Sequence, residues 1–212
     1  IKTTTVHTFH IVFILLFIIT KQIKIYGILM LFALLHEIGH LVVGILLGFK
    51  PKSLSIKPVG LSISFKTSID DIEQKVKKGN MLELKKIFIG LAGPIINLLF
   101  ATFYIKNDFE IFAIPREIGA YSNILIGIFN LIPIYPLDGG RILKSLLHIF
   151  LGYKKSLLLI RKISWGITIV ITIIASIAIL YLENFAIVII IAYLWGLNIN
   201  NNTEYKKYTQ LK

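Results

Sequence analysis

The chain has 212 residues, of which 56% are hydrophobic and only 16% are charged, and its formal net charge is +12. Because a soluble domain has about 25% charged residues, this composition favours a protein whose long apolar runs cross a lipid bilayer repeatedly. The lack of cysteine excludes disulfides, thiolate metal ligands and a cysteine nucleophile, so metal ligands must be histidine, aspartate or glutamate.

Six apolar segments are candidate membrane spans: residues 6–20, 25–47, 87–105, 119–137, 164–182 and 185–199. About 20 apolar residues cross a bilayer, so the first and the last are short for a span. The pattern predicts an all-α polytopic membrane protein with about six transmembrane helices. We expect a single domain over residues 1–212, with C-terminal helices at 164–200.

Lysine and arginine are distributed unevenly between the segments that separate these spans. If the N-terminus is cytoplasmic, 19 of the 23 basic residues fall on the cytoplasmic side and 4 on the other. Basic residues accumulate in cytoplasmic loops, so we expect both termini to lie in the cytoplasm. The net positive charge is then explained by the basic residues of the cytoplasmic segments. We expect no nucleic-acid partner, because no nucleic-acid motif and no interleaved aromatic and basic residues accompany the charge.

The segment at residues 53–65, SLSIKPVGLSISF, differs from the spans because polar and apolar residues alternate along it. The alternation predicts two short strands around the turn at residues 58–60. Unpaired strand edges are costly in lipid. Two interpretations therefore remain: a membrane-associated β-hairpin after the second span, or an ordinary cytoplasmic hairpin.

The second span contains the sequence HEIGH, in which His36 and His40 are four residues apart and Glu37 follows the first of them. On a helix the two histidines share one face. This H-E-x-x-H arrangement binds zinc through two imidazoles and uses the glutamate as a general base. A charge at the centre of a span costs about 2.5–3.5 kcal/mol. We therefore interpret the cluster as a functional site with a compensating cation, in preference to satisfied core histidines.

A third metal ligand is needed, because catalytic zinc usually has three protein ligands and a water. The best candidate is Asp138, which follows the fourth span in the sequence NLIPIYPLDGGRIL. The fourth span runs in the same direction as the second, so its end reaches the same, cytoplasmic, side. Pro133 and Pro136 break the helix before Asp138, and broken backbone is tolerated where it lines a polar cavity. Considered alone, Asp138 would be a helix-end cap.

These ligands predict one Zn2+ per chain, although two histidines and a carboxylate also suit ferrous iron. His40 lies eight residues before Gly48, about 12 Å along a helix axis. The site is therefore expected inside the bilayer, with its mouth towards the cytoplasm.

The HEIGH motif in a span, followed later by N-x-x-P-x-x-P-L-D-G, resembles the site-2 protease family of intramembrane zinc metalloproteases (peptidase family M50). Residues 93–97, GPIIN, are similar to that family's G-x-x-x-N motif. The resemblance covers residues 25–144, the expected catalytic core. It implies that His36, His40 and Asp138 hold the zinc ion and that Glu37 activates water.

The resemblance also implies roles in substrate binding. Asn97 and Asn130 match asparagines of the family's motifs and are expected to contact an extended substrate or the reacting carbonyl, with interhelical hydrogen bonding as the alternative. The predicted hairpin corresponds to a segment thought to pair with unwound substrate, and its expected contacts are Ile56, Pro58 and Gly60. Relatives often have P-x-G-G there, where this chain has PVGL at residues 58–61.

The expected function is that of an intramembrane zinc metalloendopeptidase in the bacterial cell membrane. It would cleave a membrane-associated or single-span protein and could respond to regulatory membrane proteins. Six spans and a compact chain resemble the sporulation subgroup of the family (stage IV sporulation protein FB), which implies a sigma-factor precursor or an anti-sigma factor as substrate. We expect no CBS or PDZ domain. The alternative is a membrane metal transporter or sensor that uses the same histidine and aspartate site.

Overall fold

The computed structural model describes residues 18, 21, 23–57, 60–66, 80–107, 114–182 and 186–210. The chain forms two compact units, residues 1–130 and 131–212. Nearly all of the first predicted span lies outside the described residues, and the single-domain prediction stays a prediction.

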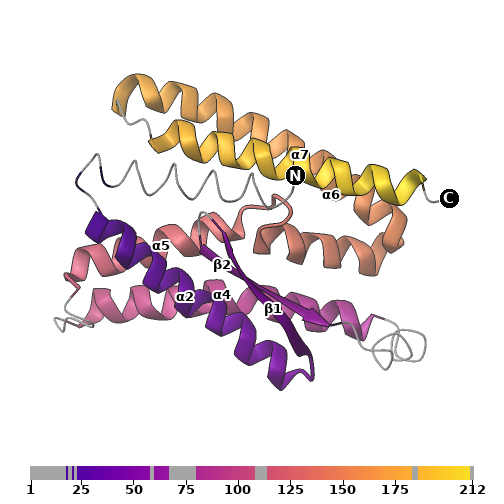
Figure 1. The fold of residues 1–212 in the computed structure, drawn as a ribbon, viewed down its shortest axis with the longest axis horizontal. Coiled ribbons are helices and arrows are strands. Elements are labelled where there is room, and N and C mark those ends of the chain that lie inside the picture. Colours follow the sequence, from indigo (N-terminus) through magenta and orange to yellow (C-terminus); the bar gives the residue numbers. More distant parts are fainter. Residues whose placement is uncertain are drawn as a thin grey trace. The chain divides into compact units, whose positions relative to one another are not determined.

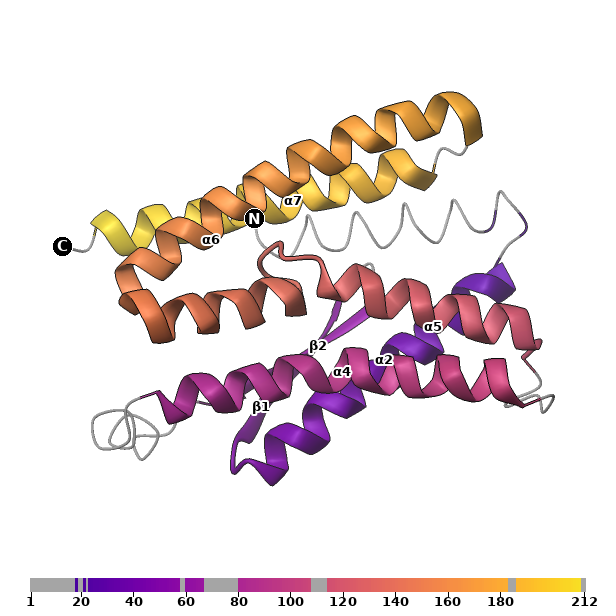
Figure 2. The same cartoon turned by 180° about the vertical axis from the view of Figure 1, so that it is seen from behind.

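The described residues of the first unit form, in order, α2 (Ile23–Leu46), β1 (Lys50–Lys57), β2 (Gly60–Lys66), α4 (Met81–Lys106) and α5 (Arg116–Leu131). The second contains α6 (Asp138–Leu182) and α7 (Ala186–Gln210), which run side by side (Figures 1 and 2). The prediction of a mainly helical, apolar fold is confirmed.

Three of the described helices are long and apolar enough to cross a membrane: α2, α4 and residues 138–179 of α6. A shorter apolar helix covers residues 187–200 within α7. The backbone of α6 turns at Gly152, where φ is 77° and ψ is 169°, so α6 consists of two helices joined across a kink. The prediction of six spans stays a prediction.

The helix of the predicted fourth span, residues 119–137, is interrupted at its C-terminal end, as its prolines predicted. Helix α5 ends at Leu131, and Asp138 is the first residue of α6. The reason is the pair of prolines in between: Pro133 and Pro136 lack a backbone donor and fix φ, so the chain cannot continue as a helix. Asp138 therefore begins a helix instead of closing one.

Helices α2 and α4 pack closely, and small residues allow it (Figures 1 and 2). A Cβ atom at Gly39 would lie 2.8 Å from Ile96 Cγ1 and 3.0 Å from the carbonyl oxygen of Ala92, closer than side chains normally approach. Such small-residue contacts are the usual way in which apolar helices pack in lipid. Towards the start of α2, Phe32 and Tyr104 are fully buried in an apolar cluster that α5 completes.

Strands β1 and β2 pair antiparallel, from Lys50 opposite Lys66 to Lys57 opposite Gly60, with one irregularity between Pro51 and Ser53. The Phe65 ring contacts Gly44 of α2 and lies 6.0 Å, centroid to centroid, from the Phe49 ring. These contacts fix the strand pair to the end of α2. Its association with a membrane stays a prediction.

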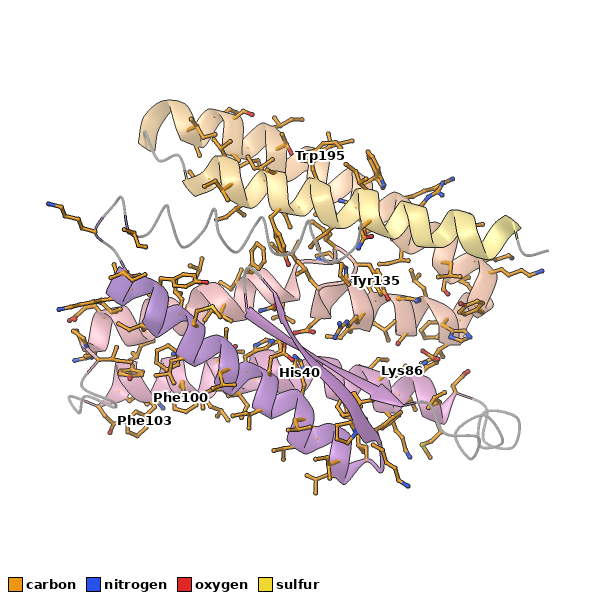
Figure 3. All side chains as sticks on the ribbon, in the orientation of Figure 1. His40, Lys86, Phe100, Phe103, Tyr135 and Trp195 are labelled. Carbon is orange, nitrogen blue, oxygen red and sulfur yellow. The ribbon has the colours of Figure 1, made fainter. Side chains whose placement is uncertain are left out.

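A line of polar side chains joins α6 and α7 in the second unit. Asn198 Nδ2 donates to Thr168 Oγ1 at 2.6 Å, and Trp195 Nε1 donates to Thr172 Oγ1 at 3.1 Å. Thr168 and Asn198 are buried, and the ring of Trp195, which is labelled in Figure 3, packs edge-on against Trp165. Hydrogen bonds of this kind hold apolar helices together where the hydrophobic effect does not distinguish helix from lipid.

Thr168→Val keeps the size of the side chain but removes the acceptor of the buried Asn198 amide. We expect it to lower the stability of the protein by about 1 kcal/mol, measured by thermal unfolding in detergent. Thr102→Val is the matched control, because Thr102 is exposed on α4 and its hydroxyl donates to carbonyls of its own helix. Equal losses in both variants would contradict a role for the interhelical bond.

Candidate metal centre

His36 and His40 lie on one face of α2, as the four-residue spacing predicted, and both are buried. Their rings meet edge to face with centroids 4.7 Å apart, and their Nε2 atoms are 3.0 Å apart. His40 is labelled in Figure 3, and the contacts of both rings with residues of α4 show that the pair faces this neighbouring helix. The structure therefore brings two candidate ligand atoms together inside an apolar helix pair.

The other ring nitrogen of each histidine is bound by an acceptor on α4. His40 Nδ1 lies 2.6 Å from the backbone carbonyl oxygen of Ile89, which can only accept, so Nδ1 carries the proton. The N–H of Gly93 is 3.4 Å from the same nitrogen and cannot donate to it once that proton is in place. His36 Nδ1 lies 2.5 Å from Asn97 Oδ1, to which it donates.

The Ile89 carbonyl oxygen has two lone pairs, and it accepts from His40 across the helix interface. Pro94 lies further along α4 and has no N–H for the carbonyl of Gly90, the residue after Ile89.

Protonation at Nδ1 leaves each neutral ring with a lone pair at Nε2. Two lone pairs at 3.0 Å do not form a hydrogen bond, and a direct bond would require an imidazolium in a buried, apolar setting. A shared cation resolves the repulsion. Two histidine nitrogens on one tetrahedral zinc ion are about 3.3 Å apart, given zinc–nitrogen distances of about 2.0–2.1 Å. The pair therefore fits zinc, with each Nδ1 held by an outer acceptor as metal-bound histidines usually are.

Gly93 leaves the space that a metal ion on this pair would need. A Cβ atom at this position would lie 2.5 Å from His36 Nε2 and 2.5 Å from His40 Nε2. Real side chains do not approach so closely, so only glycine leaves both nitrogens accessible here. Gly93 belongs to the GPIIN sequence, and its role at the histidine pair was not predicted from that motif.

Glu37 lies on α2 directly after His36 and is half-buried. It is the acidic residue of the H-E-x-x-H motif, and its place beside a ligand suits a general base. Its catalytic role stays a prediction.

Asp138 opens α6 in the second unit and is 5% exposed. Arg141 Nη1 lies 3.7 Å from Asp138 Oδ1, one helical turn further along. The residues after Asp138 must be small: a Cβ atom at Gly139 would overlap the carbonyl of Leu131, and one at Gly140 would overlap the backbone of residues 134–135. The D-G-G sequence therefore lets the proline-broken loop fold back tightly against the start of α6.

The loop that leads to Asp138 is fixed within its own unit. The Tyr135 backbone N–H donates to Ser164 Oγ at 3.1 Å, and the Leu137 N–H donates to the Ile134 carbonyl at 2.8 Å. Ile134 is fully buried. This anchoring gives the Asp138 carboxylate a defined position, as a metal ligand requires.

The predicted substrate-binding residues have different environments. Asn97 is fully buried and makes interhelical hydrogen bonds, one of the two roles expected of it. Asn130 Nδ2 donates to the Ile126 carbonyl of its own helix at 3.0 Å. Ile56 and Gly60 lie in the paired strands, and Pro58 lies outside the described residues. Contact of any of these with substrate stays a prediction.

Sequence reasoning missed three contributors to the histidine site: the Ile89 carbonyl, Gly93 and Asn123, whose Oδ1 accepts from Asn97 Nδ2 at 2.9 Å. A backbone carbonyl has no signature in a sequence. Asn123 had one, since it is a carboxamide in the apolar stretch that became α5.

Comparison with known proteins gives a consistent result. Residues 110–175 match the sequence profile of peptidase family M50. The chain is 29% identical over 167 residues to a zinc metalloprotease of Methanocaldococcus jannaschii, covering 69% of this chain and 44% of that protein. It is 29% identical over 153 residues to stage IV sporulation protein FB of Bacillus subtilis, covering 71% and 50%. The chain thus spans about half the length of these curated relatives.

The fold is similar to a solved structure, the site-2 protease from Methanocaldococcus jannaschii, with a TM-score of 0.65 and 23% identity over 93% of this chain and 88% of that one. Sequence and fold therefore agree, and they confirm the resemblance that the motifs predicted. The chain is thus similar in sequence to peptidase family M50 and to curated zinc metalloproteases, and similar in fold to a site-2 protease.

If Gly93 provides the space for a metal ion, Gly93→Ala will place a methyl group against both ligand nitrogens and weaken zinc binding by at least about tenfold. Zinc content after purification and chelator competition measure the effect. Gly127→Ala is the matched control in the same unit, because its Cβ would meet Asn97 Cβ at an ordinary 3.5 Å. Retention of zinc by Gly93→Ala at the wild-type affinity would place the metal elsewhere.

Proposed function

We propose that the chain is a zinc metalloendopeptidase of the site-2 protease type, which hydrolyses a peptide bond of a membrane-tethered protein within the bilayer. The observation that carries this proposal is the buried pair of Nε2 atoms 3.0 Å apart, each on a ring whose Nδ1 is held by an acceptor. The zinc metalloproteases among the relatives support the same chemistry.

The proposed ligands of one zinc ion per chain are His36, His40 and Asp138. All three side chains are buried, and two imidazoles with one carboxylate are a ligand set that catalytic zinc takes. Three protein ligands leave a fourth position open for water, as in catalytic zinc sites.

The proposed reaction assigns the proton transfers to Glu37. Bound zinc would supply an acidified water and polarise the scissile carbonyl. Glu37 takes one proton from that water as its oxygen attacks the carbonyl carbon. The carbon–nitrogen bond then breaks, and Glu37 passes the proton to the departing amine. The products are a new carboxyl end and a new amino end of the substrate.

The substrate must be extended at the cut, because a helix hides its carbonyls in internal hydrogen bonds. Strand addition to the edge of the β1–β2 pair would hold it unwound, with Ile56, Pro58 and Gly60 as contacts. Asn97 and Asn130 are further proposed contacts to the substrate or its reacting carbonyl.

The finer biological assignment follows from the relatives and the charge distribution. Similarity to stage IV sporulation protein FB supports regulated intramembrane proteolysis in sporulation, with a sigma-factor precursor or an anti-sigma factor as substrate and membrane proteins as regulators. The excess of lysine between the spans supports a multi-pass protein of the bacterial cell membrane with both termini and the active-site mouth in the cytoplasm.

Removing the base tests the reaction. We expect Glu37→Gln to lower the rate of cleavage of a co-expressed single-span substrate by at least about 10²-fold, because the amide cannot accept the proton of the attacking water. Zinc content should be unchanged. Glu117→Gln, an exposed position at the start of α5, is the control that should cleave at the wild-type rate. Zinc flux in proteoliposomes that survives Glu37→Gln, without any proteolysis, would instead indicate a metal transporter.

Asp138 also lies near the Arg141 guanidinium, so its role as a zinc ligand needs its own test. Asp138→Asn should weaken zinc binding by more than the roughly 10- to 100-fold expected for loss of an outer partner. Arg141→Gln removes the guanidinium 3.7 Å away and should leave zinc binding within a few-fold of wild type. If Asp138→Asn keeps its zinc and both variants unfold at the same lower temperature, Asp138 serves the ion pair and not the metal.

A further inference from the structure

A continuous line of hydrogen bonds connects α5 to the candidate metal site on α2. Asn123 Nδ2 donates to the Gly119 carbonyl oxygen at 2.9 Å, and Asn97 Nδ2 donates to Asn123 Oδ1 at 2.9 Å. Asn97 Oδ1 in turn meets His36 Nδ1 at 2.5 Å. Both asparagines have 0% exposure, so water does not compete for these groups.

The Gly119 carbonyl, at one end of this line, determines which group donates and which accepts in every bond. The Gly119 carbonyl can only accept, so the group of Asn123 that faces it must be the NH2 group. Asn123 Oδ1 then faces Asn97, which must present its own NH2 group, and Asn97 Oδ1 is left to face His36. An acceptor at that point requires the proton of His36 on Nδ1, and the lone pair is therefore on Nε2.

Reversing either amide would place like groups against each other in a buried site, either two acceptors or two donors. Such a mismatch forfeits hydrogen bonds that no water can replace. The backbone of α5 thus sets the tautomer of a side chain on α2 through two neutral carboxamides.

The two histidines differ in what fixes their tautomer. His40 is held directly by the backbone carbonyl of Ile89, which no substitution of a side chain removes. His36 depends on Asn97, and Asn97 depends on Asn123 for its orientation. His36 is therefore the ligand whose tautomer can be altered from a distance.

We propose that Asn123 is a positioning residue of the metal centre. It acts through Asn97 to keep the His36 proton on Nδ1, so that Nε2 is presented to zinc. The proposal deepens the function proposed above and rests on it, since it assumes that His36 is a zinc ligand.

The test measures zinc affinity by chelator competition at a single pH, with the full chain in detergent. Asn123→Leu keeps the size of the side chain but removes the acceptor of Asn97, and should weaken zinc binding by about tenfold or more, as loss of an outer hydrogen-bond partner does. Asn123→Asp, which is neutral in this buried apolar setting, keeps an oxygen that accepts from Asn97 Nδ2 and a hydroxyl that donates to the Gly119 carbonyl, and should stay within a few-fold of wild type. Ser122→Ala, a buried neighbour on α5, is the matched control and should bind as wild type.

A second measurement separates positioning from folding. NMR of zinc-free protein labelled with 15N-histidine reports which ring nitrogen carries the proton, and the His36 signal is assigned by its loss in His36→Gln. We expect protonated Nδ1 in wild type and Asn123→Asp, and a mixture of tautomers in Asn123→Leu. Should Asn123→Leu fail to fold, Asn123→Ala replaces it, because its side chain cannot reach Asn97.

Two results would overturn the proposal: wild-type zinc affinity and tautomer in Asn123→Leu or Asn123→Ala, or a loss in Asn123→Asp as large as that in Asn123→Leu. The second result would assign the effect to the donor facing Gly119 or to packing. If the wild-type chain itself binds no zinc, the function proposed above is wrong. The tautomer measured by NMR then still decides whether Asn123 fixes the His36 proton through this line of hydrogen bonds.

Discussion

Two imidazoles that face each other through their lone pairs, buried between apolar helices, are the constraint on which this molecule depends. Neutral rings at an Nε2 separation of 3.0 Å repel unless a cation lies between them or a proton is shared, and a shared proton would make one ring an imidazolium in a buried, apolar setting. The packing of α2 against α4 serves this arrangement. Gly39 lets the helices approach closely enough for α4 to supply both acceptors, and Gly93 keeps α4 from covering the ligand atoms. A bulky residue at either glycine would affect the metal site as well as the helix interface.

In the second unit, the position of Asp138 depends on a loop and not on the packing of two long helices. Asp138 stands where a helix begins, after a loop that two prolines keep from being helical and two glycines allow to fold tightly. The loop is tied by the Tyr135–Ser164 bond to α6, and α6 is tied to α7 by the buried Thr168–Asn198 bond. The C-terminal helices thus hold the loop before Asp138 and the start of α6 in place within their own unit.

The sequence was sufficient for features that depend on spacing along one element and insufficient for those that depend on how elements meet. The shared face of His36 and His40 follows from the 3.6-residue helical period, and the break before Asp138 follows from the chemistry of proline. The apolar pattern alone extends the fourth span to Leu137, whereas α5 ends at Leu131, two residues before the first of these prolines. The Ile89 carbonyl could not be predicted, since every residue has one. Asn123 could be recognised as a costly polar group, but its link to His36 depends on the rotation of α5 about its axis.

The use of amides instead of carboxylates behind His36 has a physical reason in this setting. An outer carboxylate would also fix the Nδ1 proton, but it would bury another charge in an apolar segment at a cost of about 2.5–3.5 kcal/mol. It would also add negative potential beside Glu37, which must lose and regain a proton during the proposed reaction. Asn97 and Asn123 transmit the polarity of a backbone carbonyl over two side chains without adding any formal charge. The tautomer of His36 is then fixed by the packing of α2, α4 and α5, without a further buried charge beside the histidines.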